Sequence, residues 1–343
     1  MAGIDGSAVR ATRERFGLTQ AQLAERAGVS RQVVVTVEAG RHAPSVDAAM
    51  RLARALGASV EDLFAAPVEE FDAVVGGYAD GDRVIAGRVG GRAVVQTVDE
   101  RFGGSGSWLP ADGTIEGGLR LFPGATSEGL VVVGCDPALG VAGTLLSGRG
   151  TRRLVPVSAS TGAALEALAG RRCHGVLVHG PAGSLPAAPC PVERWHLARW
   201  QIGVAIPRGR GDGTLEAALA AERGLVQREP SAASQQGLER AAARLGTVVP
   251  APLRVASGHL DAARSAALLG VAGVTFEPAA AAFGLAFEPL ETHVVELWVA
   301  ERYLEHPGVA ALGELVSSAA FQRRVAAIGG YDLAGCGTIE EAA

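Results

Sequence analysis

The sequence of 343 residues predicts a multi-domain chain with an all-α head, a small β-rich middle module and a larger α/β region. Three segments with different residue patterns lead to this prediction. Residues 1–66 have helical periodicity and few glycines, residues 67–128 are rich in glycine and contain short β-type runs, and residues 129–343 alternate apolar runs with helical patterns. We therefore expect domain boundaries near residues 66 and 128.

The composition is that of a folded protein without a strong attraction to polyanions. Hydrophobic residues make up 48% of the chain and charged residues 20%, which is too apolar for a disordered chain. The 31 basic residues are all Arg, and they stand against 36 acidic residues, which gives a net charge of −5. This balance argues against a protein that coats nucleic acid or a membrane surface without selectivity.

Local capping signals define two helices in the first segment. Thr19 and Gln22 have the spacing of a capping box, and Gly28 suits the left-handed residue that ends a helix. Ser30 is a favourable N-cap for the next helix, which we expect to end near Gly40. The pattern thus predicts two short helices that are joined by a tight turn.

The second of these helices is expected to expose an unusual face. Val34 and Val37 are three residues apart, so both turn toward the core. The outward residues are then Arg31, Gln32, Val33, Val35 and Thr36. A face that combines Arg and Gln with exposed valines indicates a surface that contacts a partner.

Residues 7–65 closely resemble the Xre-type, phage-repressor-like family of helix-turn-helix domains. The segments that carry the resemblance are Thr19–Ala24, Gly28–Gln32, Glu38–Arg41, Pro44–Ser45 and Val60–Phe64. The resemblance implies a recognition helix from Ser30 to Glu38 that enters the major groove of DNA. The residues implied to bind DNA are Gln20, Ser30, Arg31, Gln32, Val33, Thr36 and Arg41.

The chemistry of these side chains agrees with that implication. Arg and Gln pair with guanine and adenine edges, Val can touch thymine methyl groups, and helix N-termini and Arg suit phosphates. Residues 1–66 contain eight Arg against seven acidic residues, which is weakly basic for a DNA binder. We therefore expect a homodimer on a palindromic double-stranded operator. A helical bundle that mediates protein contacts is the alternative.

The middle segment predicts a β-hairpin. The runs 83–86 and 93–98 are β-type, and Gly90 and Gly91 between them supply the positive φ angles of a tight turn. We expect linkers at Pro67 and in the glycine-rich segment 102–126.

The third segment predicts a parallel sheet with helices between its strands. The apolar runs 130–133, 153–157 and 175–178 alternate with helical patterns over 137–146 and 161–169. The stretch 266–287 has a single charge, but its glycines and Pro278 favour a buried strand and an Ala-rich helix over a membrane span.

Residues 129–335 resemble the two-lobed, type II periplasmic-binding-protein-like domain that occurs behind such helix-turn-helix modules. The relevant segments are Gly134–Leu139, Ser158–Gly162, Leu225–Arg228, Gly258–Asp261 and Ala320–Leu333. The resemblance implies two crossings between the lobes, near 199–206 and 290–299, and a ligand cleft between them. It also implies a sensor of a small molecule or of an oxyanion such as molybdate.

The expected cleft residues are those at strand ends and helix starts. They are Asp136, Ser158, Ser160, Thr161, Arg228, Ser231, Ser234 and His259. Hydroxyls, helix N-termini and one Arg suit a small anion. Asp136 and Glu229 would oppose an oxyanion and could instead select a cationic or amphoteric organic ligand. N-capping alone is the other interpretation of the serines.

Catalysis, metal binding and cofactors are not predicted. The histidines lack a metal-ligand spacing, and the phosphate-binding loop that needs a Lys is excluded because the chain has none. Cys135 is expected to pack in the core. We predict a cytoplasmic, ligand-responsive transcriptional regulator that does not bind membranes. An enzyme on the two-lobed scaffold, with Asp136 and His259 as an acid–base pair, and a constitutive DNA-binding scaffold without a ligand are the alternatives.

Overall fold

The computed structural model describes residues 7–64, 70–98, 111–148, 150–209 and 213–340. Within this part of the chain, two compact units separate, the N-terminal unit (Met1–Glu69) and the C-terminal unit (Glu70–Ala343). No helix in the described ranges is both long enough and apolar enough to span a bilayer.

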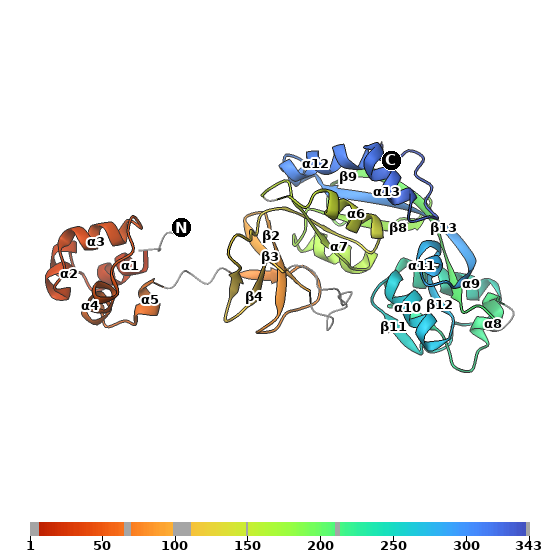
Figure 1. The fold of residues 1–343 in the computed structure, drawn as a ribbon, viewed down its shortest axis with the longest axis horizontal. Coiled ribbons are helices and arrows are strands. Elements are labelled where there is room, and N and C mark those ends of the chain that lie inside the picture. Colours follow the sequence, from red (N-terminus) through yellow and green to blue (C-terminus); the bar gives the residue numbers. More distant parts are fainter. Residues whose placement is uncertain (1–6, 65–69, 99–110, 149, 210–212, 341–343) are drawn as a thin grey trace. The chain divides into compact units, whose positions relative to one another are not determined.

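The N-terminal unit is all helical (Figure 1). Its helices are α1 (Ser7–Arg15), α2 (Gln20–Ala27), α3 (Arg31–Glu38), α4 (Val46–Leu56) and α5 (Val60–Phe64). The predicted caps are confirmed: Gln22 N donates to Thr19 Oγ1 at 3.2 Å, and Thr19 N donates to Gln22 Oε1 at 2.8 Å. Gly28 has a φ of +64°, and Ser30 Oγ accepts from Val33 N. The capped turn therefore fixes how α3 follows α2.

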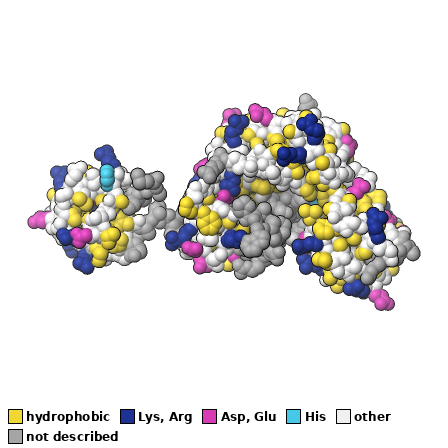
Figure 2. Space-filling model, in the orientation of Figure 1, with side chains coloured by type: hydrophobic (Ala, Val, Ile, Leu, Met, Phe, Trp, Pro, Cys, Tyr) yellow, Lys and Arg dark blue, Asp and Glu magenta, His cyan; other side chains and the backbone are white. Residues whose placement is uncertain are grey.

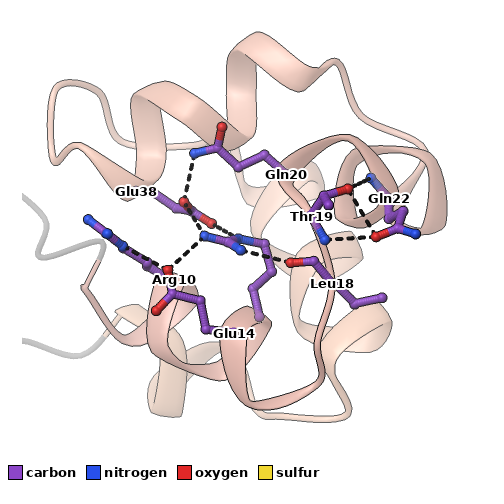
Figure 3. Close-up of polar contacts among 8 residues, drawn as sticks. Arg10, Glu14, Leu18, Thr19, Gln20, Gln22 and Glu38 are labelled. Atoms are coloured by element: carbon purple, nitrogen blue, oxygen red, sulfur yellow. Dashed lines mark hydrogen bonds and ion pairs between the residues drawn. The ribbon is translucent and has the colours of Figure 1, made fainter.

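A buried ion pair joins three helices of this unit (Figure 3). Arg13 Nε of α1 donates to Glu38 Oε1 of α3 at 2.6 Å, and the side chains are only 10% and 4% exposed. Arg13 also donates to the carbonyl oxygen of Leu18, and Gln20 Nε2 of α2 donates to Glu38 Oε2 at 3.0 Å. The same carboxylate thus positions the start of α2 and the end of α3.

The C-terminal unit begins with a five-stranded sheet in the order β1-β3-β2-β4-β5. Its strands are β1 (Phe71–Ala73), β2 (Arg83–Val89), β3 (Arg92–Thr97), β4 (Gly113–Ile115) and β5 (Leu119–Leu121). The predicted hairpin is confirmed as β2 and β3, and Gly90 and Gly91 have φ angles of +58° and +85°.

The expected linker at 102–126 is wrong in its second half. Residues 113–121 form β4 and β5, which pair with each other and, through β4, with β2. A Cβ atom on Gly113 would lie 2.2 Å from the carbonyl oxygen of Arg120, so glycine here allows close strand pairing rather than a flexible connection. Pro67 and residues 102–110 lie outside the described residues.

A nine-stranded mixed sheet forms the rest of the unit, in the order β11-β10-β12-β9-β13-β8-β6-β7, with β14 (Ile339–Glu340) paired to β9. The first lobe contains β6 (Leu130–Val133), β7 (Leu154–Val157), β8 (Gly175–Pro181), α6 (Pro137–Leu145) and α7 (Thr161–Ala169). The second lobe contains β10 (Val226–Arg228), β11 (Arg254–Ala256), β12 (Gly273–Phe276), α8 (Leu215–Leu219), α9 (Ala233–Arg244), α10 (His259–Leu269) and α11 (Glu277–Ala282). The C-terminal helices α12 (Pro307–Val316) and α13 (Ala319–Ala326) pack on α6.

Two long strands connect the lobes (Figure 1). β9 (Val192–Ile206) and β13 (Ala286–Ala300) pair antiparallel with each other. On one side β13 pairs with β8 of the first lobe, and on the other β9 pairs with β12 of the second lobe. The predicted crossings at 199–206 and 290–299 lie within these strands, and the strand and Ala-rich helix expected in 266–287 are β12 and α11.

Asp136 fastens α6 to distant parts of the chain. Its carboxylate caps α6 by accepting from Ala138 N at 2.7 Å. It also accepts from Trp200 Nε1 of β9 at 2.8 Å and from the Tyr331 hydroxyl at 2.7 Å. Three donors therefore surround this buried side chain, which ties the first lobe to a crossover strand and to the C-terminal segment.

The buried ion pair of the N-terminal unit yields one prediction. Arg13→Ala leaves the Glu38 carboxylate without its cation, which should cost about 3 kcal/mol or more. Hydrogen exchange of peptides from residues 7–64 should then accelerate about a hundredfold. The control is Arg10→Ala, which removes an exposed i,i+4 pair with Glu14 and should change exchange by less than about threefold. Equal effects of the two variants would contradict the assignment.

The Asp136 contacts yield a second prediction. In the Asp136→Asn variant, the side-chain NH₂ group faces Trp200 Nε1, so two hydrogen-bond donors oppose each other. The free energy of unfolding should therefore fall by about 1–3 kcal/mol. Burial raises the pKa of Asp136, so the wild-type protein loses stability as the pH rises through the raised pKa, whereas the Asn variant does not. The deficit of the variant should therefore shrink as the pH rises above about 4, the usual pKa of a carboxyl group, in urea titrations followed by tryptophan fluorescence. A deficit that is independent of pH would contradict this account.

Candidate functional site

The outer face of α3 is the first candidate site. Val34 and Val37 are 0% and 2% exposed, as predicted, while Arg31 and Gln32 are exposed and Thr36 is half-buried. Among the contacts found in the described ranges, none engages the guanidinium of Arg31 or the amide of Gln32. The two groups with the richest hydrogen-bonding capacity on this face are therefore available to an outside partner.

The other residues expected at DNA already have roles within the unit. Ser30 caps α3, the Thr36 hydroxyl donates to the carbonyl oxygen of Gln32 at 2.9 Å, and the Gln20 amide donates to Glu38. Val33 is half-buried and Arg41 is exposed. In Figure 2 the Arg side chains on the visible face of this unit are scattered among acidic and apolar ones. This surface therefore offers specific hydrogen-bonding groups rather than a strong positive charge.

The second candidate site is a cavity of about 660 Å³ that both lobes line. Thr161 and Gly162 of α7 come from the first lobe, Ser231 and Arg240 come from the second, and Glu291 comes from β13. A Cβ atom on Gly162 would lie 2.7 Å from the Cβ of Ser231, so the lobes approach each other closely here. The cavity therefore belongs to a closed arrangement of the lobes.

Three predicted cleft residues carry buried polar atoms without partners in the described part of the chain. These atoms are Thr161 Oγ1, Ser234 Oγ and both ring nitrogens of His259. The residues are 5%, 1% and 1% exposed. A buried polar group without a hydrogen bond costs about 1–3 kcal/mol, so each of these atoms retains the capacity to bind a small molecule or water.

The remaining predicted cleft residues have contacts of other kinds. Ser158 is exposed, and Ser160 caps α7 through Ala163 N. The Arg228 guanidinium donates to the carbonyl oxygens of Ala256 and Ser257 and to Glu229, so its charge is held against the second lobe. Of the eight predicted residues, Thr161 and Ser231 line the cavity.

The structure also brings together side chains that the sequence left unassigned. Cys135 Sγ lies 3.3 Å from His179 Nε2, and the ligand atoms of Cys135, His179 and His259 all lie within 4.8 Å of one another. His179 Nδ1 lies 2.9 Å from His293 Nδ1, and His293 Nε2 lies 2.7 Å from Glu291 Oε1. We call Cys135, His179 and His259 the interlobe cluster.

Burial keeps the histidines of this cluster neutral. Loss of solvent lowers the pKa of His179 and His259 well below the usual value, and the nearby Arg228 charge lowers both further. Burial also raises the pKa of Cys135 to about 12. The three members lie on β8, on α10 and in the loop after β6, far apart in the sequence. No sequence motif therefore indicates this cluster, and only the folded structure brings its members together.

Two family models match different parts of the chain. Residues 9–63 match a helix-turn-helix family model, and residues 145–317 match the model of the PBP superfamily domain. An uncharacterized HTH-type transcriptional regulator of Methanothermobacter thermautotrophicus is 51% identical over 57 residues, which are 16% of this chain and 83% of that protein. Another, of Archaeoglobus fulgidus, is 40% identical over 62 residues, which are 18% of this chain and 89% of that protein.

Among solved structures, the restriction-modification controller protein C.AhdI of Aeromonas hydrophila is 36% identical, with 17% of this chain and 89% of that chain covered and a TM-score of 0.17. The P22 c2 repressor in complex with a synthetic operator is 26% identical, with 19% and 97% covered and a TM-score of 0.18. The identity to the curated relatives indicates the family of the N-terminal segment, and the second family model covers about half of the chain. The chain belongs to the HTH-type transcriptional regulators, and the larger part of it is a PBP superfamily domain.

Proposed function

We propose that this regulator acts in the cytoplasm as a homodimer that binds a palindromic operator and responds to a small molecule or oxyanion in its two-lobed domain. The observation that carries the proposal is the combination, on one chain, of an exposed reading face on α3 and a cavity lined by both lobes. Residues 67–128 are proposed as the module that links the head at 1–66 to the sensor at 129–343.

The reading face supports recognition of bases by Arg31 and Gln32. Both side chains are exposed and uncommitted in the described ranges, and both can pair bidentately with purine edges in the major groove. Gln20, Ser30 and Arg41 are proposed to contact phosphates, and Val33 and Thr36 to lie against the bases. A head with nearly balanced charge gains little affinity from counterion release, so two heads on two half-sites supply the binding energy.

The cavity supports an effector that stabilises the closed lobes. Thr161 from the first lobe and Ser231 from the second lobe line it, and Arg240 and Glu291 add an ion pair between α9 and the crossover strand. A ligand that contacts both lobes binds the closed state better than the open one and shifts the population toward it. Molybdate and tungstate are the first oxyanions to test, because of the family resemblance.

The first prediction of this proposal concerns Arg31. Arg31→Ala should weaken binding to the preferred operator by about 1–3 kcal/mol, which is about fivefold to 150-fold, and relax base preference at one position of each half-site. The operator is obtained by selection from a random duplex library with the wild-type protein, and affinity is measured by fluorescence anisotropy.

The matched control is Arg54→Ala, since Arg54 is an exposed Arg near the end of α4. It should leave the base preference unchanged. If Arg31→Ala lowers affinity equally for every sequence, Arg31 contacts phosphate and not bases, and the proposed reading role is wrong.

The second prediction concerns coupling between the sites. Molybdate, tungstate and small organic acids are screened for a raised melting temperature, and each compound that raises it is tested for an effect on operator affinity. We expect at least about a fivefold change in one direction, because coupling free energies between two sites are typically about 1–3 kcal/mol. Thr161→Ala should reduce the melting shift, whereas Ser158→Ala should not. An effector that stabilises the protein and leaves operator affinity unchanged would contradict the proposal.

A further inference from the structure

We propose that the interlobe cluster, Cys135, His179 and His259, binds a transition-metal ion of the zinc class and that this ion joins the two lobes. The proposal names the class of effector for the sensor domain, so its regulatory part rests on the proposed function. The binding itself rests on three features of the cluster: distance, lone-pair direction and unmet hydrogen bonding.

The distances suit a tetrahedral metal site that needs a small adjustment. Zinc binds sulfur at about 2.3 Å and imidazole nitrogen at about 2.0 Å, which places neighbouring ligand atoms about 3.5 Å apart. Cys135 Sγ and His179 Nε2 are 3.3 Å apart. The ligand atom of His259 lies within 4.8 Å of both. A movement of about 1 Å by His259 would complete a three-ligand site.

A hydrogen-bonded chain aims the lone pair of His179 at Cys135. The Glu291 carboxylate accepts from His293 Nε2, so the Nδ1 atom of neutral His293 is an acceptor. His179 Nδ1 must then donate to it, which leaves the lone pair of His179 on Nε2, the atom that faces Cys135 Sγ. Metal-binding histidines are oriented in this way by a carboxylate behind the ring. Glu291 and His293 are therefore positioning residues.

The charges around the cluster are partly compensated. The Arg228 guanidinium donates to Glu229 and to the carbonyl oxygens of Ala256 and Ser257, so its charge is directed at these acceptors. A thiol binds zinc as the thiolate, so an incoming ion would displace the Cys135 proton to the solvent. One thiolate also reduces the charge that a divalent ion brings into this buried place.

His259 supplies the observation that is independent of the cluster geometry. The ring is 1% exposed, and neither nitrogen has a hydrogen-bond partner in the described ranges. It packs between aromatic rings, with centroid distances of 5.6 Å to Trp200 and 4.8 Å to Phe276. A neutral imidazole held in this way loses its hydrogen bonds to water and gains none from the described residues, and a metal ion that takes its lone pair would offset this loss.

The position of the ligands gives the ion a mechanical role. Cys135 follows β6 and His179 lies on β8, both in the first lobe, whereas His259 begins α10 in the second lobe. An ion bound to all three holds the lobes closed. Thiolate with two imidazoles favours zinc and related ions over magnesium or calcium, which prefer oxygen.

The test uses cobalt(II) as a spectroscopic probe of the full-length protein under reducing conditions. We expect one equivalent of cobalt to produce tetrahedral d–d bands and a thiolate-to-cobalt charge-transfer band, and zinc to displace it. Cys135→Ser should lose the charge-transfer band, and His259→Gln should weaken binding at least about tenfold. Cys190→Ser and His42→Gln are the matched controls and should behave as the wild type.

X-ray absorption of the zinc-loaded wild-type protein provides a test that needs no variant. It should show one sulfur at about 2.3 Å and imidazole nitrogens at about 2.0 Å. Absence of the cobalt bands, an unchanged band in Cys135→Ser, or a shell of oxygen ligands would overturn the site. Operator affinity measured with and without zinc separates the two proposals. If zinc binds at the cluster and operator affinity does not change, the metal site is confirmed and its regulatory role is wrong. If zinc does not bind, the metal site is wrong, and the proposed function then requires another effector.

Discussion

The pairing of β9 with β13 is the constraint on which the two-lobed domain depends. These strands form an antiparallel ladder from Ala286 opposite Ile206 to Ala300 opposite Val192, with two register shifts along it. Each lobe extends its own part of the sheet from one of them, so the lobes share a backbone hinge rather than a flexible linker. A register shift between Pro289 and Glu291 inserts one residue into β13. Such a bulge bends the strand and redirects its side chains, next to the point where Glu291 and His293 meet the interlobe cluster.

Close backbone contacts, rather than side-chain identity, then bring the first-lobe ligands together. A Cβ atom on Gly134 would lie 2.5 Å from the Cβ of Leu177, so the chain after β6 can approach β8 only with glycine at this position. Cys135 follows Gly134 directly, and His179 lies two residues after Leu177 on the same strand. The 3.3 Å separation of thiol and imidazole is therefore a consequence of strand packing. Because both strands are buried on both faces, this arrangement is closely packed.

The sequence predicts those parts of the structure whose interactions are local. The capping box at Thr19, the N-cap Ser30 and the glycine turn of the β2–β3 hairpin depend on residues at most a few positions apart, and all three are confirmed. The interlobe cluster could not be predicted in this way, because Cys135 and His259 are separated by more than a hundred residues and meet only through the sheet order. Asp136 illustrates the same limit: the sequence indicates a polar residue at a strand end, but its donors, Trp200 and Tyr331, come from distant segments.

In the proposed function, the weak charge of the DNA-binding head is related to the closure of the two lobes. A strongly basic head would hold DNA through charge alone, and its affinity would depend little on how two heads are spaced. With eight Arg against seven acidic residues in residues 1–66, the proposed homodimer would gain its affinity from two heads that meet two half-sites at the correct separation. A tenfold change in operator affinity needs only about 1.4 kcal/mol of difference between the open and closed lobes. A few contacts across the cleft can supply that amount, because the buried groups of Thr161, Ser234 and His259 already lack partners in the described structure.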